Sequence, residues 1–123
     1  MIKRMPTNCG DNTCPSCTAA GDFIFLAHHA GGRNEKDVES QMKAALEKVK
    51  KTLESVGAEM NDMVQLNLYL RNLEDFEKAR KVFNEYFDEG NFPARMTTTT
   101  DFIDAYCLCM VDGTAYKPGV GNK

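Results

Sequence analysis

The chain has 123 residues, 42% of them hydrophobic and 27% charged, a length that supports one domain with a single core and excludes a multidomain enzyme. Fifteen Lys and Arg stand against eighteen Asp and Glu, which gives a net charge of -3. This charge provides no overall positive field for a phosphate backbone, so we do not expect a nucleic-acid partner.

We expect one domain over residues 1–123, with no membrane partner. No stretch reaches the roughly 20 consecutive apolar residues that cross a bilayer. Met1–Arg4 is followed by Pro and polar residues rather than by a secretory apolar segment. These features predict a cytoplasmic protein. Five Cys is an odd number in a chain long enough to fold without cross-links, which favours reduced thiols.

The first half of the chain predicts a lead-in, a strand and a helix. Residues 1–21 are rich in Cys, Gly and Pro, which predicts an irregular Cys-rich lead-in that pairs at a sheet edge near its end. The aromatic and β-branched run 23–30 predicts a strand buried on both faces at its start. Asn34 is expected to cap a helix that Gly57 ends. The apolar residues of this helix form one stripe: Val38, Met42, Ala45, Leu46, Val49, Leu53 and Val56.

The second half predicts a strand, a helix and two more strands. Met63–Arg71 alternates apolar and polar residues, as a strand does when one face covers a core. Asn72 is expected to cap a helix with an aromatic stripe. Further strands are predicted at Arg95–Asp101 and Ala105–Asp112. Residues 117–123 are expected to form a flexible tail that frays.

The order of these elements predicts an α+β fold with one sheet and both helices on one face, because each helix has a single apolar stripe to bury. The opposite face of the sheet carries apolar and polar side chains and also needs cover. In so small a chain, the simplest cover is the same sheet of another copy. We therefore expect a closed homo-oligomer.

Several motifs occur together in this order. Tyr86-Phe87 is followed by Asn91-Phe92-Pro93-Ala94-Arg95, the most specific of them. The others are Gly21-Asp22-Phe-Ile-Phe-Leu, Val38-Glu-Ser-Gln-Met-Lys-Ala-Ala-Leu, Val56-Gly57-Ala58 and Leu66 to Leu73 with Phe76 beyond. Over roughly residues 12–115 the chain resembles the Rid/YjgF family of reactive-intermediate deaminases, long labelled endoribonuclease L-PSP or translation-inhibitor proteins.

The resemblance implies a chorismate-mutase-like fold, a βαβαββ sheet in a homotrimer whose three sheets form an inner β-barrel. It implies ligand clefts between the subunits. It also implies hydrolysis of 2-imino or enamine acids to 2-oxo acids and ammonia, with no cofactor and no metal. The family arginine that grips the substrate carboxylate matches Arg95.

Arg95 also has a physical case of its own. A guanidinium group is always charged, and its fork matches a carboxylate with two parallel hydrogen bonds. An Arg that leads from a rigid Pro turn into a strand has a fixed base from which to present that fork. The sequence therefore predicts a small carboxylate-bearing metabolite as ligand. The other interpretation is an Arg paired with Asp or Glu at a subunit boundary.

The chain departs from the family pattern at several site positions. Ala27-His28-His29 stands where many members have Ser-Gly-Gln, and Met110 falls at the position of the family glutamate. A thioether cannot take a proton, and Asp112 lies two residues further along the same strand face. An asparagine of the family aligns with Arg80 and a tyrosine with Ser16.

One of the two histidines could replace the missing base, because imidazole titrates near neutrality. Adjacent strand residues face opposite sides, so only one can do so. We expect it to be His29, which matches the polar glutamine of the family. A His bonded across strands or packed in a subunit seam is the other interpretation of each.

The expected site joins these residues. The catalytic set is Arg95, His29 and Asp112. The expected substrate contacts are Arg95, Ala27, Thr97, Ser16, Cys17, Arg80 and Met110.

The cysteines allow another chemistry. Cys9, Cys14 and Cys17 have the spacing C-x4-C-x2-C, and Cys107 and Cys109 place both sulfurs on one strand face. Soft ligands so placed could hold zinc or an iron-sulfur cluster. They could equally be free or redox-active thiols, and a Cys17 thiol beside the cleft could react with electrophiles. Because the family uses no metal, we expect none.

Three functions remain open from the sequence. The first is a hydrolytic deaminase of 2-imino or enamine acids. The second is a non-catalytic binding protein for a small carboxylate, which the replacement of the family glutamate by Met110 favours. The third is a metal or redox sensor built on the cysteines.

Overall fold

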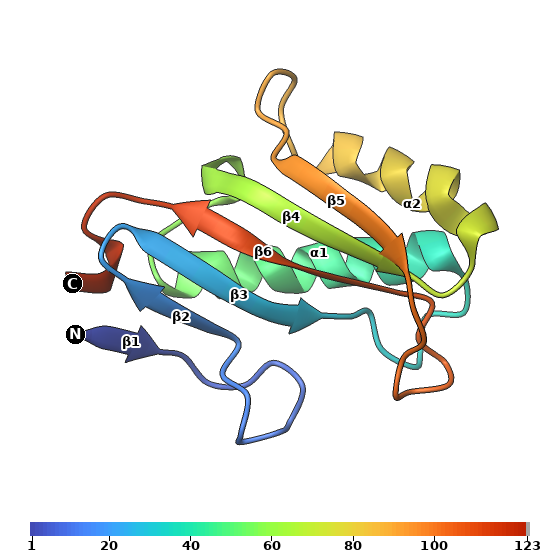
Figure 1. Cartoon of the computed structure of the whole chain (residues 1–123), viewed down its shortest axis with the longest axis horizontal. Coiled ribbons are helices and arrows are strands. Elements are labelled where there is room, and N and C mark those ends of the chain that lie inside the picture. Colours follow the sequence, from blue (N-terminus) through green and yellow to red (C-terminus); the bar gives the residue numbers. More distant parts are fainter. Residues whose placement is uncertain (123) are drawn as a thin grey trace.

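The computed structural model describes residues 1–122 and shows one six-stranded sheet with two α-helices (Figure 1). The strands are β1 (Ile2–Arg4), β2 (Cys17–Ala20), β3 (Phe23–His29), β4 (Met63–Leu70), β5 (Ala94–Thr99) and β6 (Cys109–Tyr116). The helices are α1 (Val38–Ser55) and α2 (Phe76–Val82), with short 3-10 turns η1 (Met60–Asp62), η2 (Leu73–Asp75), η3 (Phe83–Glu85) and η4 (Val120–Asn122).

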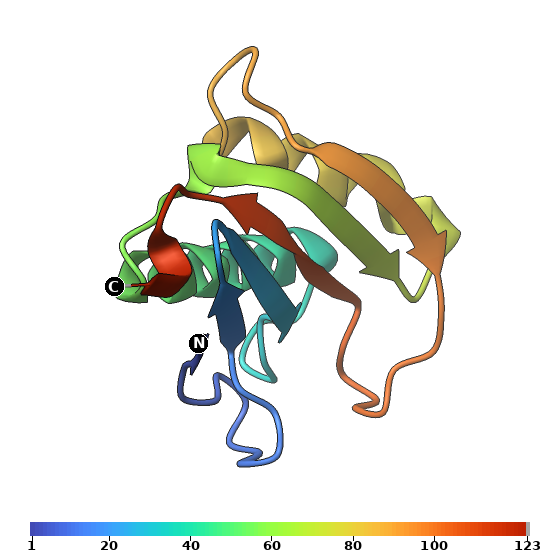
Figure 2. The same cartoon turned by 60° about the vertical axis from the view of Figure 1, so that its left-hand side comes forward.

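The sheet is mixed, with strand order β1-β2-β3-β6-β4-β5. β4 and β5 are parallel and the other neighbours are antiparallel. Both helices lie on the same face of the sheet (Figure 2), which we name the helix face, and the opposite face is the open face. The predicted α+β fold with both helices on one face is therefore confirmed. Neither helix within residues 1–122 has the length and apolar composition to cross a membrane.

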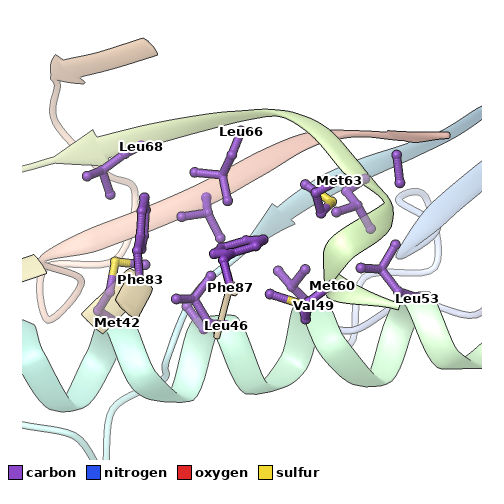
Figure 3. Packing of buried hydrophobic residues seen from close by; sticks show 14 of the residues in the cluster. Met42, Leu46, Val49, Leu53, Met60, Met63, Leu66, Leu68, Phe83 and Phe87 are labelled. Carbon is purple, nitrogen blue, oxygen red and sulfur yellow. The ribbon is translucent and has the colours of Figure 1, made fainter. Parts of the chain in front are cut away.

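The core lies between the helices and the helix face. Every residue of the predicted α1 stripe is buried. Figure 3 shows Met42 and Leu46 of α1 close to Leu66 and Leu68 of β4, with Phe83 between helix and sheet. Because apolar burial is the main stabilising term, this layer fixes how the sheet and helices are oriented.

The N-terminal region differs from its prediction. The lead-in is not irregular throughout, because β1 and β2 pair with each other and β2 pairs with β3. β3 is buried on one face only: Ile24 and Leu26 lie in the core, whereas Phe23 is 43% and Phe25 48% exposed. The prediction of two buried faces was wrong for the single chain, because no element within residues 1–122 covers the open face.

Helix α1 begins later than predicted. Its N-cap is Asp37, whose Oδ1 accepts a hydrogen bond of 2.8 Å from the backbone N–H of Ser40. Asn34 lies in the preceding turn and does not cap the helix. The end was predicted correctly, since Gly57 has the positive φ of 85° that a helix stop requires.

The last strand and the tail also differ from prediction. β6 begins at Cys109 instead of Ala105, because residues 100–108 form a connection held by hydrogen bonds from Arg71. Residues 117–122 do not fray. The Gly121 N–H donates to the Gly21 carbonyl at 2.8 Å and Val120 is buried. The last residue of the predicted tail lies outside the described residues.

We expect Asp37→Ala to lower the free energy of unfolding and Asn34→Ala to leave it unchanged. The hydrogen bond from the Ser40 backbone lowers the pKa of Asp37 below its ordinary 3.8. A lowered pKa stabilises the fold above that ordinary value, and the stabilisation is lost as the pH falls through the folded-state pKa. Urea unfolding of both variants between neutral and acid pH measures this. Equal stability of the two variants would contradict the assigned cap.

Candidate functional site

Arg95 lies on the helix face of β5, the edge strand of the sheet. Its guanidinium carbon is 5.5 Å from the ring centroid of Phe76 and 5.5 Å from that of Phe83. Its Nε donates a hydrogen bond of 3.1 Å to Oγ1 of Thr97, two residues along the strand. The aromatic rings and the hydroxyl fix the direction of the fork.

The charge of Arg95 has no carboxylate partner within residues 1–122. The ion pairs there join other side chains: Arg33 with Asp104, Lys43 with Glu85, and Arg80 with Glu77. All β5 residues are exposed. The terminal nitrogens of Arg95 are thus positioned at the surface, as the recognition of an external anion requires.

Asp112 lies on the open face, with its carboxylate held by two donors on the neighbouring strand. Asn67 Nδ2 donates to Oδ1 at 2.7 Å, and the Tyr69 hydroxyl donates to Oδ2 at 3.0 Å. Burial and then the bond to Asp112 raise the pKa of Tyr69. The sequence pattern did not single out either partner, although the alternation of β4 places Asn67 and Tyr69 on its polar face.

A cavity of about 750 Å³ opens beside Asp112. Its floor includes His28, Tyr69, Met110 and Asp112 of the sheet. The 100–108 connection forms one wall, and the loop between β1 and β2 contributes Cys9. Both segments extend from the same end of the sheet (Figure 2). This cavity is large enough for a small metabolite and combines an apolar lining with polar groups.

His29 lies in the core and does not line the cavity. Its Nδ1 donates to the Ala27 carbonyl at 2.7 Å, and its Nε2 accepts from the Thr52 hydroxyl at 2.9 Å. Burial lowers the pKa of His29, which keeps the ring neutral. An irregularity in the pairing of β3 with β6, between Leu26 and His29, turns His29 inward. His28 is exposed and is the imidazole that reaches the cavity.

The other predicted substrate contacts are either buried or already bonded to groups of the same chain. Ser16 and Cys17 are buried, and the Ser16 carbonyl accepts the Ala27 N–H at 3.0 Å. Burial raises the pKa of the Cys17 thiol. Arg80 Nη2 pairs with Glu77 at 2.7 Å, so its charge is already matched.

The exposed thiol is Cys9, whose pKa is lowered by the Thr7 hydroxyl. None of the five cysteines forms a disulfide. Within residues 1–122, no three His, Cys, Asp or Glu side chains are grouped as a metal site would need. The spacing of Cys9, Cys14 and Cys17 therefore does not produce a ligand set in the described chain.

The structure thus divides the predicted catalytic residues between two faces. Arg95 and Thr97 lie on the helix face of the edge strand, while Asp112 and Met110 lie on the open face beside the cavity. Along a strand, odd and even positions face opposite sides. One copy of the chain cannot bring Arg95 and Asp112 to the same ligand.

Comparison with known proteins gives consistent matches. The family model described as Endoribonuclease L-PSP matches residues 16–107. A RutC family protein of Pyrococcus abyssi is 35% identical over 103 residues, which cover 79% of this chain and 80% of the relative. A 2-iminobutanoate/2-iminopropanoate deaminase of Dermatophagoides farinae is 35% identical over 83 residues, 63% of this chain and 64% of the relative.

Solved structures show the same fold. An uncharacterized protein of Pseudomonas aeruginosa superposes with a TM-score of 0.87 at 20% identity, covering 95% of this chain and 99% of that one. A yjgF family member of Streptococcus pyogenes gives 0.83 at 28% identity, covering 95% and 97%. The mixed sheet with two helices on one face is common to these proteins and this chain.

The buried His29 should make the stability of the fold depend on pH. Because the folded-state pKa of His29 lies below the ordinary 6.5, the unfolded chain takes up a proton that the fold does not, and stability falls as the pH drops below 6.5. We expect His29→Gln to weaken this loss between about pH 7 and pH 5. His28→Gln, an exposed matched control, should keep the wild-type dependence. Urea unfolding across this range measures it, and identical profiles for both variants would show that His29 is not a buried neutral ring.

Proposed function

The chain belongs to the endoribonuclease L-PSP (Rid/YjgF) family, and we propose that it hydrolyses 2-imino acids to 2-oxo acids and ammonia in a cleft between two copies. The observation that carries this proposal is Arg95, a fixed and exposed guanidinium without an acidic partner in the described chain. The deaminase names of relatives from Dermatophagoides farinae and Salmonella typhimurium support the choice of substrate class.

In the proposed site, Arg95 holds the substrate carboxylate with two parallel hydrogen bonds. Thr97 accepts a hydrogen bond from Nε and leaves the terminal nitrogens for the ligand. Positioning of this kind provides much of the rate when the substrate is already activated, as an imine is.

The reaction needs a group that moves protons, and we assign this role to Asp112. In the proposed step, water adds to the imine carbon while Asp112 accepts a proton from that water. That proton is delivered to the imine nitrogen, which gives a carbinolamine. Asp112 then transfers the proton of the carbinolamine hydroxyl to the nitrogen, the carbon–nitrogen bond breaks, and ammonia leaves with the 2-oxo acid. Asn67 and Tyr69 orient the carboxylate through one hydrogen bond to each oxygen.

A second copy completes the cleft, because Arg95 and Asp112 lie on opposite faces of one sheet. The open face also has apolar surface to cover: Phe23, Phe25 and Tyr116 form an exposed aromatic cluster with centroid distances of 6.4 and 5.4 Å. Large exposed aromatic groups of this kind favour an interface. We propose the trimer with an inner β-barrel of the chorismate-mutase-like fold, in which Arg95 of one copy reaches the Asp112 cavity of the next.

Arg95 substitutions test the carboxylate clamp. We expect Arg95→Ala to reduce kcat/KM for 2-iminobutanoate by roughly 100-fold or more, because charged hydrogen bonds contribute about 1.5–3 kcal/mol each and two are lost. Arg95→Lys should lose roughly tenfold, since it keeps the charge without the fork. The imine is generated in situ and its disappearance is followed with and without protein. Full activity of Arg95→Ala would exclude this clamp.

Mixing two inactive variants tests whether the site spans two copies. Arg95→Ala and Asp112→Asn chains are denatured together and refolded at equal amounts. If each site takes Arg95 from one copy and Asp112 from its neighbour, about one quarter of the sites are intact and about one quarter of the wild-type activity returns. Separately refolded variants are the controls. Absence of recovery would show that Arg95 of one copy and Asp112 of its neighbour do not form one site.

A second candidate function is binding of a small carboxylate without turnover. Met110, which has no titratable group, lines the cavity where a base would be useful. In that case imine decay is unchanged by the protein, whereas small carboxylates raise its melting temperature through Arg95. The same two Arg95 variants distinguish these functions.

A further inference from the structure

The cavity beside Asp112 is larger than a short-chain imino acid requires. Its volume of about 750 Å³ is on the order of 25 times the volume of one water molecule in the liquid. Ligand pockets of about 300–1,000 Å³ typically take ligands of drug size and are lined mostly by apolar side chains. The volume therefore leaves room for a large substituent beyond the reacting carbon.

One wall of the cavity is mainly apolar. Phe102, Ile103 and Tyr106 come from the 100–108 connection, which forms this wall, and the floor adds Met110 and Tyr69 of the sheet. Ile103 is fully exposed and Tyr106 is 59% exposed in the single chain. Apolar side chains at a cavity mouth gain free energy when a ligand removes them from water.

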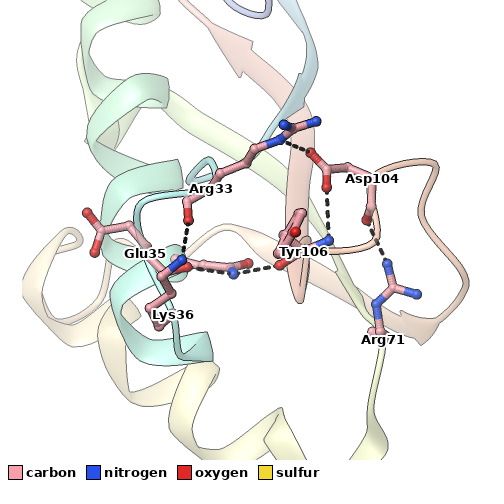
Figure 4. Close-up of polar contacts among 7 residues, drawn as sticks. Arg33, Glu35, Lys36, Arg71, Asp104 and Tyr106 are labelled. Atoms are coloured by element: carbon pink, nitrogen blue, oxygen red, sulfur yellow. Dashed lines mark hydrogen bonds and ion pairs between the residues drawn. The ribbon is translucent and has the colours of Figure 1, made fainter.

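This wall is held in place by side chains of the rest of the fold. Arg71 donates through Nε to the Cys107 carbonyl at 2.8 Å and through Nη2 to the Asp104 carbonyl at 2.8 Å. Its guanidinium carbon also lies 5.3 Å from the centroid of the Phe102 ring. Figure 4 shows Arg71 and Arg33 on either side of Asp104. The connection is thus fixed from two sides.

Buried Gln41 of α1 adds a third attachment. Its Nε2 donates to the Tyr106 carbonyl at 2.9 Å, and its Oε1 accepts from the Leu108 N–H at 2.7 Å. Because the wall is ordered before a ligand binds, binding does not have to order it, and shape can discriminate between ligands.

The charges of the cavity determine which end of a ligand lies against the wall. The charged lining residues other than Asp112 are Asp101 and Asp104 of the connection, Asp11 of the loop between β1 and β2, and Lys48 of α1. The two carboxylates of the connection disfavour the carboxylate of a substrate at that wall. An imino acid held by Arg95 at its carboxylate and by Asp112 at its reacting carbon therefore has its side chain toward Phe102 and Tyr106.

From this arrangement we infer that the protein prefers 2-imino acids with bulky apolar side chains, branched or aromatic, over 2-iminobutanoate. The inference rests on the proposed function for the reaction and goes further in naming the substrate side chain. One additional methylene in an apolar pocket typically changes kcat/KM by roughly 10- to 200-fold.

The test compares imines generated in situ from leucine, from phenylalanine and from 2-aminobutyrate by an amino-acid oxidase. We expect kcat/KM for at least one of the two bulky imines to exceed that for 2-iminobutanoate by about tenfold or more. Phe102→Ala, which removes the wall, and Met110→Trp, which fills the cavity from the strand, should each bring the ratio toward one. Leu73→Ala, an exposed apolar residue outside the cavity lining, is the matched control and should keep the ratio.

The outcomes separate this inference from the proposed function. Equal rates on all three imines, or a preference for the smallest, would overturn the inference and leave the deaminase function standing. If no imine is hydrolysed, the proposed function is wrong. Calorimetry of 2-oxo acid binding to the wild-type protein then tests whether the cavity prefers bulky side chains. Tighter binding of 4-methyl-2-oxopentanoate or phenylpyruvate than of 2-oxobutanoate then supports the inference, and equal or absent binding refutes it.

Discussion

The packing of α1 against the sheet is the constraint on which the rest of the structure depends. α1 has one apolar stripe, α2 continues into Phe83 and Phe87, and both bury against the same sheet residues, Leu66 and Leu68. With all of this apolar surface on the helix face, none of the helices and strands that the structure describes covers the open face. The exposed aromatic cluster and the Asp112 cavity both lie there. The same packing that stabilises one copy therefore leaves exposed the surface on which we propose that a second copy binds.

Much of the central fold could be predicted because the spacing of apolar residues along a helix or strand indicates which of its faces is buried. The α1 stripe, the alternation of β4 and the glycine stop at Gly57 depend only on neighbours in sequence. Arg95 could be singled out for the same reason, since a rigid Pro turn and an aromatic helix lie close to it in the chain. The stacking of its guanidinium on Phe76 and Phe83 agrees with that local context.

The features that could not be predicted depend on contacts between distant residues. The start of β6 is set by Arg71 and Gln41, which bond to a connection more than thirty residues away in sequence. The direction of His29 depends on a pairing irregularity that no pattern in β3 reveals. Asn67 and Tyr69 were visible as polar strand residues, but their bonds to Asp112 follow from the register of β4 and β6. A single sequence carries little information about such register.

The place of β6 has a consequence for how the chain folds. β6 is the last strand in the sequence, yet it lies between β3 and β4 in the middle of the sheet. During synthesis, β3 and β4 each keep an unpaired edge until residues 109–116 emerge from the ribosome. Such edges can pair with other chains. β6 thus joins the two parts of the sheet late in synthesis. Premature termination just before it would leave two separate partial sheets that are prone to aggregation.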